Sequence, residues 1–189
     1  AGLLFGKILR SPHAHARIVS IDTSAAEALP GVHAVVTSAD FPEIEGGTMV
    51  SDGEGGFTDV GRLRDNVLAG GKALYKGHAI AGVAASSSHV AEEAVSLIDV
   101  KYDVLAPVMT APQGMEKDAP ILLEDLETEE LGATLPGPTN VAEHIQHVKG
   151  DVEKGFADAD IVVEREFNTA TVHQGYIEPH AASAFWSSD

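Results

Sequence analysis

The stretch GKALYKGHAIAGVAASSSHVAEEAVSLIDVKYDVLAPV, residues 71–108, carries the clearest fold signal in this chain of 189 residues. Residues 78–86 are a continuous apolar run of strand length. Residues 89–98 place apolar side chains on one helical face, and Ser88 is suited to cap that helix. Residues 99–105 alternate apolar and polar, which is typical of a half-buried strand. Strand, helix and strand in this order predict a compact unit of mixed α and β structure.

The residues before this stretch predict further short elements. Ser24 followed by Glu27 has the spacing of a capping box, and Pro30-Gly31 ends the short helix that this predicts. Residues 41–65 are rich in Gly, Asp and Glu, so we expect a long loop there. Three short apolar runs are predicted strands: residues 3–9, 16–21 and 32–37.

The residues after the stretch are less regular. Residues 106–140 contain five prolines and an acidic run, which predict an extended connector across the surface. Gly150-Asp151 opens a predicted short helix. Three further strands are predicted over residues 141–148, 160–171 and 181–187. The last two lack evident partner strands, and exposed strand edges would favour dimerisation or aggregation.

The formal charge of −17 is concentrated in two segments. Residues 43–59 hold five acids and no base, and residues 116–130 hold seven acids beside Lys117. This distribution favours solvated surface over a cation-binding site. A nucleic-acid partner is disfavoured, because a phosphate-binding face needs clustered Lys and Arg.

The chain contains no cysteine, which excludes disulfides, cysteine-held iron–sulfur clusters and thiolate zinc sites within these residues. That composition is compatible with a cytoplasmic location. There is no run of about 18 apolar residues, so no membrane span is predicted. The first residue is Ala1, and the chain stops in mid-pattern at residues 184–189, AFWSSD. We therefore expect both ends to be cuts in a longer protein.

Three ordered stretches resemble the large subunit of the molybdenum hydroxylases, the xanthine dehydrogenase/aldehyde oxidase family. Residues 6–40 contain the turn Ser-Pro-His-Ala-His-Ala and a Leu-Pro-Gly-Val before a strand. Residues 71–108 contain the Ala-rich helix and the pattern Val-x-Tyr-x-x-Leu. Residues 150–186 contain a Gly-Asp-Val start, an Ala-Asp-hydrophobic-Val-Glu run and a Glu-Pro segment. Together these stretches cover about 110 of the 189 residues in the order of the family.

The resemblance implies an α+β fold in three parts. These would be an α/β-hammerhead domain over residues 1–110, an acidic, Pro-containing connector over 111–140, and the beginning of a molybdopterin-binding domain over 141–189. It also implies an oxidoreductase that hydroxylates a purine, aldehyde, N-heterocycle or related substrate with oxygen from water. The implied cofactor is molybdenum–molybdopterin, with FAD and iron–sulfur clusters on other subunits or domains.

The implied partners are the remaining molybdopterin-binding domains, the FAD and iron–sulfur subunits, and a small-molecule substrate. The Gly-Gly-Gly-Phe-Gly-Gly-Lys segment of the family and its distant general-base glutamate are not in this sequence. We therefore expect an N-terminal fragment that is inactive alone and binds no cofactor stably.

The best local candidate for a site is the segment His173–His180, HQGYIEPH. It resembles the family segment that approaches the active site, and Gln174 and Glu178 are its candidate hydrogen-bonding residues near the cofactor. The alternative is that Glu178 only orders a loop through a backbone hydrogen bond. We predict no catalytic residue within the chain.

Other polar clusters have simpler interpretations. His13 and His15 project on one face of an extended chain and could bind a metal, but two further ligands are missing, so we predict a structural turn and no metal site. Ser86, Ser87 and Ser88 lack the Gly-x-Ser-x-Gly pattern of a nucleophile and mark the start of a helix. Two carboxylate groups, Asp40, Glu43 and Glu45 and then Glu127, Glu129 and Glu130, are read as solvated surface.

Two other functions remain open at this point. The chain could be a free-standing hammerhead module for structure or assembly without redox activity. It could also be an acidic module for divalent cations, although the Asp-x-Asp-x-Asp-Gly pattern of calcium loops is absent.

Overall fold

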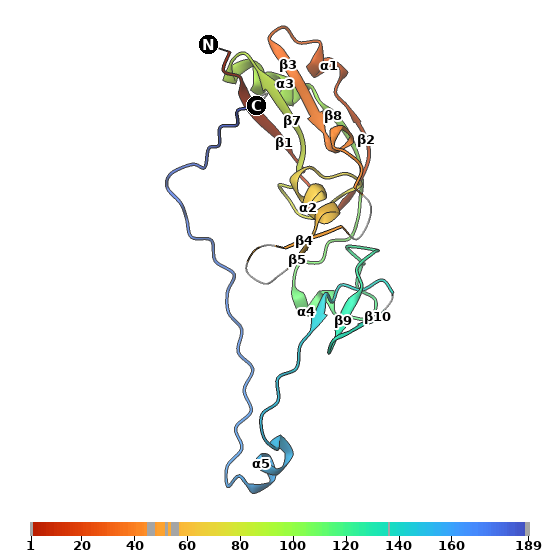
Figure 1. Cartoon of the computed structure of the whole chain (residues 1–189), viewed down its shortest axis with the longest axis vertical. Helices are drawn as coiled ribbons and strands as arrows, with labels where there is room; N and C mark the ends of the chain where they lie inside the picture. The colour runs from red at the N-terminus through yellow and green to blue at the C-terminus, as the bar shows by residue number, and fades with distance from the viewer. Residues whose placement is uncertain (1, 45–47, 52, 54–56, 136, 188–189) are drawn as a thin grey trace. The chain divides into compact units, whose positions relative to one another are not determined.

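The computed structural model describes residues 2–44, 48–51, 53, 57–135 and 137–187 (Figure 1). The fold is α+β, as expected, and the chain divides into two compact units, residues 1–145 and residues 146–189. None of the described helices is long and apolar enough to cross a membrane.

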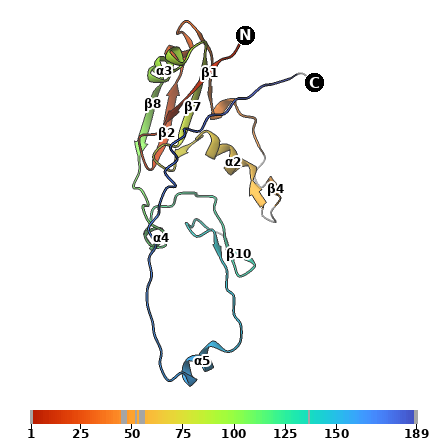
Figure 2. The ribbon, with the colours of Figure 1, turned by 90° about the vertical axis from the view of Figure 1, so that its left-hand side faces the viewer.

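The first unit is built around two antiparallel sheets of three strands, ordered β1-β7-β3 and β6-β2-β8 (Figures 1 and 2). Their strands are β1 (Phe5–Arg10), β2 (Ala16–Asp22), β3 (Val32–Thr37), β6 (Lys72–Ala73), β7 (Ala79–Ala85) and β8 (Asp99–Val104). Two helices belong to the same region, α1 (Ser24–Glu27) and α3 (Ser88–Leu97). The predicted strands that correspond to β1, β2, β3, β7 and β8 are confirmed, as is the helix that corresponds to α3.

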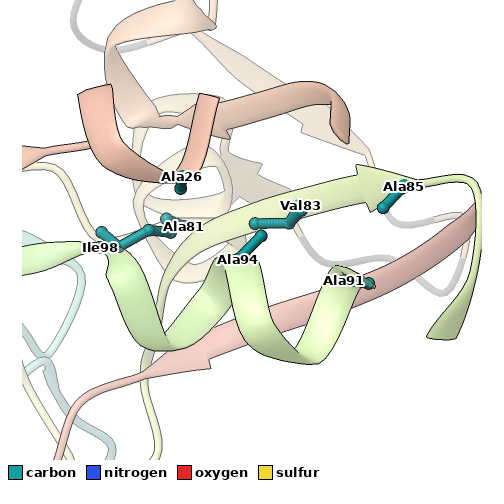
Figure 3. Packing of buried hydrophobic residues seen from close by; sticks show 7 residues of the cluster. All are labelled: Ala26, Ala81, Val83, Ala85, Ala91, Ala94 and Ile98. Carbon is teal, nitrogen blue, oxygen red and sulfur yellow. The ribbon is translucent and has the colours of Figure 1, made fainter. Parts of the chain in front are cut away.

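Small side chains allow the central strand and the helix to pack closely. Strand β7, AIAGVAA, lies between β1 and β3, and its residues are buried or half-buried. Figure 3 shows Ala91 and Ala94 of α3 facing Ala81 and Val83 of β7. Because the alanine side chain is only a methyl group, the helix can approach the sheet closely. The packing of this core therefore requires small side chains at these positions.

Gly31, between α1 and β3, is required by the backbone. Its φ is +95°, in the region that favours glycine, and an added Cβ would lie 2.8 Å from the Ser86 hydroxyl. The Ser86 amide also donates to the Gly31 carbonyl, at 2.8 Å. The Pro-Gly pair that ends the predicted helix therefore also seats β3 against the end of β7.

The helix caps differ in detail from the prediction. Ser87, not Ser88, caps α3, because its hydroxyl accepts from the Val90 amide at 3.2 Å. The capping box predicted at Ser24 and Glu27 is wrong. The Ser24 hydroxyl instead donates to Asp22, at 2.6 Å, which leaves it unavailable to the helix.

A capping box is present instead at the N-terminus of the short 3-10 helix η1 (Ser38–Asp40), which follows β3. The Thr37 hydroxyl accepts from the Ala39 amide, and the Asp40 carboxylate accepts from the Thr37 amide at 2.7 Å. Asp40 therefore has a local structural role.

The long loop expected over residues 41–65 is only partly correct. The described residues there include the paired strands β4 (Met49–Ser51) and β5 (Phe57–Asp59), followed by helix α2 (Val60–Val67). The Asp59 carboxylate caps α2 by accepting from the Arg62 amide at 3.0 Å. This cap stabilises the start of α2 after the Gly-rich segment.

The extended connector expected over residues 106–140 contains regular structure. Helix α4 (Ala111–Gly114) and a sheet ordered β10-β9-β11 are present, with β9 (Thr128–Glu130), β10 (Ala133–Leu135) and β11 (Glu143–His144). Leu131 and Gly132 both have positive φ, which is the geometry of a tight hairpin turn between β9 and β10. The strand predicted over 141–148 is reduced to the two residues of β11.

The second unit has one helix, α5 (Val152–Asp158), which Asp151 caps by accepting from the Lys154 amide at 2.8 Å. The strands predicted over 160–171 and 181–187 are absent from the described residues, which run without helix or strand after α5 (Figure 2). A strand exists only when a neighbour satisfies its backbone amides and carbonyls, and the described chain offers these residues no such neighbour.

Candidate functional site

Gln174 and Glu178 lie in an open part of the second unit. Every described residue from 146 to 187 is exposed. Local order in the segment comes from its rings, because Tyr176 contacts His173 and His180 with centroids 5.9 and 4.9 Å apart. The Gly175 amide also donates to His173 Nδ1, at 3.0 Å. Neither Gln174 nor Glu178 has a hydrogen-bond partner among the described residues, so the structure does not bring the two candidates into a site.

The same unit does not offer a fitting site for molybdopterin by itself. Its open hollow beside α5 has a volume of about 320 Å³ and is lined only by Gly, Ala, Val, Ile and Phe side chains. A pterin that carries a phosphate needs hydrogen-bond donors and positive charge. The described residues of this unit therefore do not form a cofactor pocket by themselves.

His13 and His15 belong to a structural turn, as predicted. His15 is 3% exposed, and its Nδ1 donates to the Ala106 carbonyl at 2.8 Å. The ring of His13 packs edge-on against Tyr102, with centroids 5.0 Å apart. Ser11, also in this turn, exchanges backbone hydrogen bonds of 2.8 Å with Gly77 and His78. The turn therefore joins β1 and β2 to the segment that precedes β7.

Two acidic residues of the second predicted cluster also have local partners. Glu129 accepts from the Thr134 hydroxyl at 2.6 Å, and Glu130 contacts His144 Nδ1 at 2.7 Å. Glu45 lies outside the described residues. Among those that are described, no group of three or more His, Asp or Glu side chains is arranged to hold a metal ion.

The most enclosed polar feature of the first unit is centred on His78, a residue that the sequence did not single out. Its side chain is 1% exposed, and both ring nitrogens are engaged. Nδ1 accepts from the Leu74 amide at 3.3 Å, so Nε2 carries the proton and donates to the Asp65 carbonyl at 2.9 Å. Tyr75 stacks on the ring at 4.4 Å and donates to Asn66 at 3.1 Å.

A pocket of about 380 Å³ adjoins this histidine. Helix α2 and its cap contribute Asp59, Gly61, Arg62, Asp65 and Asn66, while the connector contributes Leu123 and Asp125. The pocket is thus large enough for a small molecule and has both polar and apolar walls. The sequence signal for it was weak: a single His after Gly77, at the start of a buried strand.

Comparison with known proteins explains the fold of the first unit. Residues 1–106 match the family model described as aldehyde oxidase and xanthine dehydrogenase, a/b hammerhead domain, which is more than half of the chain. The chain belongs to this aldehyde oxidase and xanthine dehydrogenase family. Residues 135–189 match the molybdopterin cofactor-binding domain. The resemblance drawn from the three sequence stretches is therefore confirmed.

Individual members of the family agree with this assignment. The probable hypoxanthine oxidase XdhD of Escherichia coli is 36% identical over 92% of this chain and 20% of its own length. The carbon monoxide dehydrogenase large chain of Afipia carboxidovorans is 38% identical over 94% of this chain and 21% of its own. The solved carbon monoxide dehydrogenase from Oligotropha carboxidovorans has a TM-score of 0.61 at 35% identity, covering 85% of this chain and 19% of that one. The chain thus spans about one fifth of these relatives.

Proposed function

We propose that this chain is the N-terminal part of the molybdenum-cofactor-binding subunit of an oxidoreductase of the aldehyde oxidase and xanthine dehydrogenase type. The observation that carries the proposal is the order of the two family matches on one chain, the hammerhead domain over 1–106 and the molybdopterin cofactor-binding domain over 135–189. The parent protein would hydroxylate a purine, aldehyde, N-heterocycle or related substrate with oxygen from water.

Three parts are proposed for the chain: a hammerhead domain over 1–110, a connector over 111–140, and the beginning of a cofactor-binding domain over 141–189. The first would act as a scaffold, since its buried His78 engages both ring nitrogens in structural hydrogen bonds. In the third, the exposed Gln174 and Glu178 are free to bind a group supplied by the rest of the protein. Molybdopterin, when bound, would supply the redox-active metal.

Partners follow from the same proposal. FAD and iron–sulfur clusters would lie on other subunits or domains and receive the electrons, and the remaining molybdopterin-binding domains would complete the site. The cytoplasmic location expected from the sequence is part of this proposal. The names of the two relatives refer to hypoxanthine and to carbon monoxide, so the substrate must be found by experiment.

The test uses the whole protein with its partner subunits. Purified complex is incubated with an artificial electron acceptor and a panel of purines, aldehydes and N-heterocycles in water enriched in heavy oxygen. We expect one class to be oxidised, with the heavy isotope in the product. Oxidation without isotope incorporation would contradict the hydroxylation chemistry. A molybdenum-free protein that oxidises nothing in the panel would favour the alternative of a structural or assembly module.

The roles of Gln174 and Glu178 have their own test. In the whole protein, Glu178→Gln and Gln174→Ala are expected to lower the turnover number while the molybdenum content stays unchanged. His173→Ala, in the same exposed segment, is the control for a loss of local order. Unchanged turnover in both variants would remove these residues from the site.

A further inference from the structure

Within the first unit, two ion pairs hold the acidic connector to β6 and α2. Lys72 Nζ of β6 contacts the Glu124 carboxylate at 2.8 Å, and the Lys72 side chain is only 15% exposed. Arg62 of α2 contacts the neighbouring Asp125, with its Nη2 at 3.6 Å from the carboxylate and 3.4 Å from the carbonyl. Two consecutive acids are thus paired with two cations from different elements.

The pairs are needed because the segment has few other bonds. Within residues 121–126, which we call the strap, the Leu126 amide donates to the Leu123 carbonyl at 3.3 Å. The Leu122 amide donates to the Asn140 side chain at 2.9 Å, and that side chain also donates to the Pro120 carbonyl at 2.9 Å. The N-terminal end of the strap is therefore anchored by Asn140, whereas its centre is held by the half-buried Leu123 and by the pairs with Lys72 and Arg62.

The charge of the surrounding sequence acts against closure. The run from 116 to 130 carries seven acids and one lysine, so its members repel one another. The pKa of Glu124 is lowered, mainly by its hydrogen bond with Lys72, which agrees with a true charge pair. Without the two cations, repulsion within the run would favour a detached strap.

The strap also forms part of the wall of the His78 pocket. Leu123 and Asp125 line the cavity of about 380 Å³ together with Asp65 and Asn66 of α2. Detachment of the strap would remove this wall and expose the cavity. The position of residues 121–126 therefore controls solvent access to the pocket.

We propose that residues 121–126 form an electrostatic strap, held by Lys72 and Arg62, which closes the His78 pocket and opens when salt screens the two ion pairs. This inference does not depend on the redox function of the protein. It gives the acidic run, which the sequence indicated as plain solvated surface, a conformational role.

The test is hydrogen–deuterium exchange of the whole protein, read by mass spectrometry in peptides that cover residues 121–126 and residues 79–85. We expect Lys72→Met and Arg62→Met each to speed exchange in the strap roughly two- to fivefold, the range expected for one ion pair of this kind. Exchange in β7 should not change. Lys76→Met is the matched control, because Lys76 is exposed and takes part in none of the ion pairs among the described residues.

The second part of the test is the dependence of this exchange on salt concentration. Raising the ionic strength from about 0.01 to about 1 M shortens the Debye length from about 30 to about 3 Å. This change should speed exchange of the wild-type strap. In the Lys72→Met, Arg62→Met double variant it should leave exchange unchanged or slow it, because salt there screens only the repulsion among the acids. The charge-reversed pair Lys72→Glu, Glu124→Lys should restore slow exchange, which also shows that the variants fold.

Two results would overturn the proposal. In one, the strap exchanges at the wild-type rate in both methionine variants and at every salt concentration. In the other, β7 loses protection together with the strap, so the ion pairs support the whole fold and not a separate moving segment.

Discussion

His78 is the least exposed of the buried polar residues described in the first unit. Its two ring nitrogens serve opposite purposes, one accepting from the Leu74 amide and the other donating to the Asp65 carbonyl. The side chain therefore connects the end of α2 to the turn before β7. An apolar side chain of similar volume could fill the space but would satisfy neither backbone group.

His78→Leu is predicted to lower the free energy of unfolding of the chain by about 2–4 kcal/mol. The reason is that each buried backbone group left without a partner costs about 1–3 kcal/mol. His89→Leu, at an exposed position of α3, is the control and should change stability by less than about 0.5 kcal/mol. Urea unfolding followed by circular dichroism measures both, and equal effects of the two substitutions would contradict this role of His78.

The pKa of Asp22 leads to a prediction about a single residue. Its pKa is lowered, first by the hydrogen bond from the Ser24 hydroxyl and second by that from the Ser24 amide. A carboxyl group whose pKa falls on folding stabilises the fold above its unfolded pKa, and this contribution is lost as the pH drops through the folded pKa. Ser24→Ala should therefore raise the pKa of Asp22 toward its ordinary value.

The measurement is an NMR titration of the Asp22 carboxyl carbon in the wild-type chain and in Ser24→Ala. The Asp103 carboxyl carbon in the same spectra is the internal control, because Asp103 does not contact Ser24. If the Asp22 titration curve did not move, the hydroxyl would not be the main cause of the lowered pKa.

At the scale of elements, the central packing depends on alanine. Ala91 and Ala94 of α3 and Ala81 and Ala85 of β7 are all fully buried in one cluster. Close-packed interiors have no room for added methyl groups. The distance between α3 and the sheet is therefore set by these small side chains.

Ala94→Leu is predicted to destabilise the first unit by about 1–3 kcal/mol, the usual cost of overpacking a core. Glu93→Leu, at the adjacent exposed position of the same helix, should have an effect within about 0.5 kcal/mol. Thermal or urea unfolding of the two variants checks this. A stable Ala94→Leu variant would mean that α3 can move away from β7 without loss.

The elements that could be predicted from sequence are those with a strong local pattern. Strands β3, β7 and β8 and helix α3 follow directly from apolar runs and periodicity in residues 32–37 and 78–105. The capping box predicted for α1 was wrong because Asp22, just before the helix, accepts from the Ser24 hydroxyl. Helix α2 was missed because the glycines before Asp59 favoured a loop.

The site was less predictable than the fold. The contacts of His78 with Asp65 and of Lys72 with Glu124 join residues that are distant in sequence, so no local pattern indicates them. Gln174 and Glu178 were found only through family resemblance, and the described residues leave them exposed. Their role therefore stays a prediction.

At the scale of the molecule, the second unit exposes many apolar side chains. Ile177 is fully exposed, and Phe185 and Trp186 are more than nine-tenths exposed. Such a surface is typical of a segment that packs against another chain or domain. The earlier expectation of dimerisation or aggregation therefore remains a prediction for the 189-residue chain.

Size-exclusion chromatography with light scattering tests the expected dimerisation or aggregation. The 189-residue chain is expected to elute as dimers or larger species, and a chain of residues 1–145 should be monomeric, because it lacks the exposed segment. A monomeric 189-residue chain at high concentration would contradict this expectation.

The central claim is that the chain is part of a subunit that carries molybdopterin. The most direct measurement is the molybdenum and pterin content of the whole protein, purified from cells grown with molybdate. The account predicts molybdenum and pterin in equal amounts, each stoichiometric with the subunit. A correctly folded whole protein that contains neither, from cells whose other molybdenum enzymes are loaded, would contradict it.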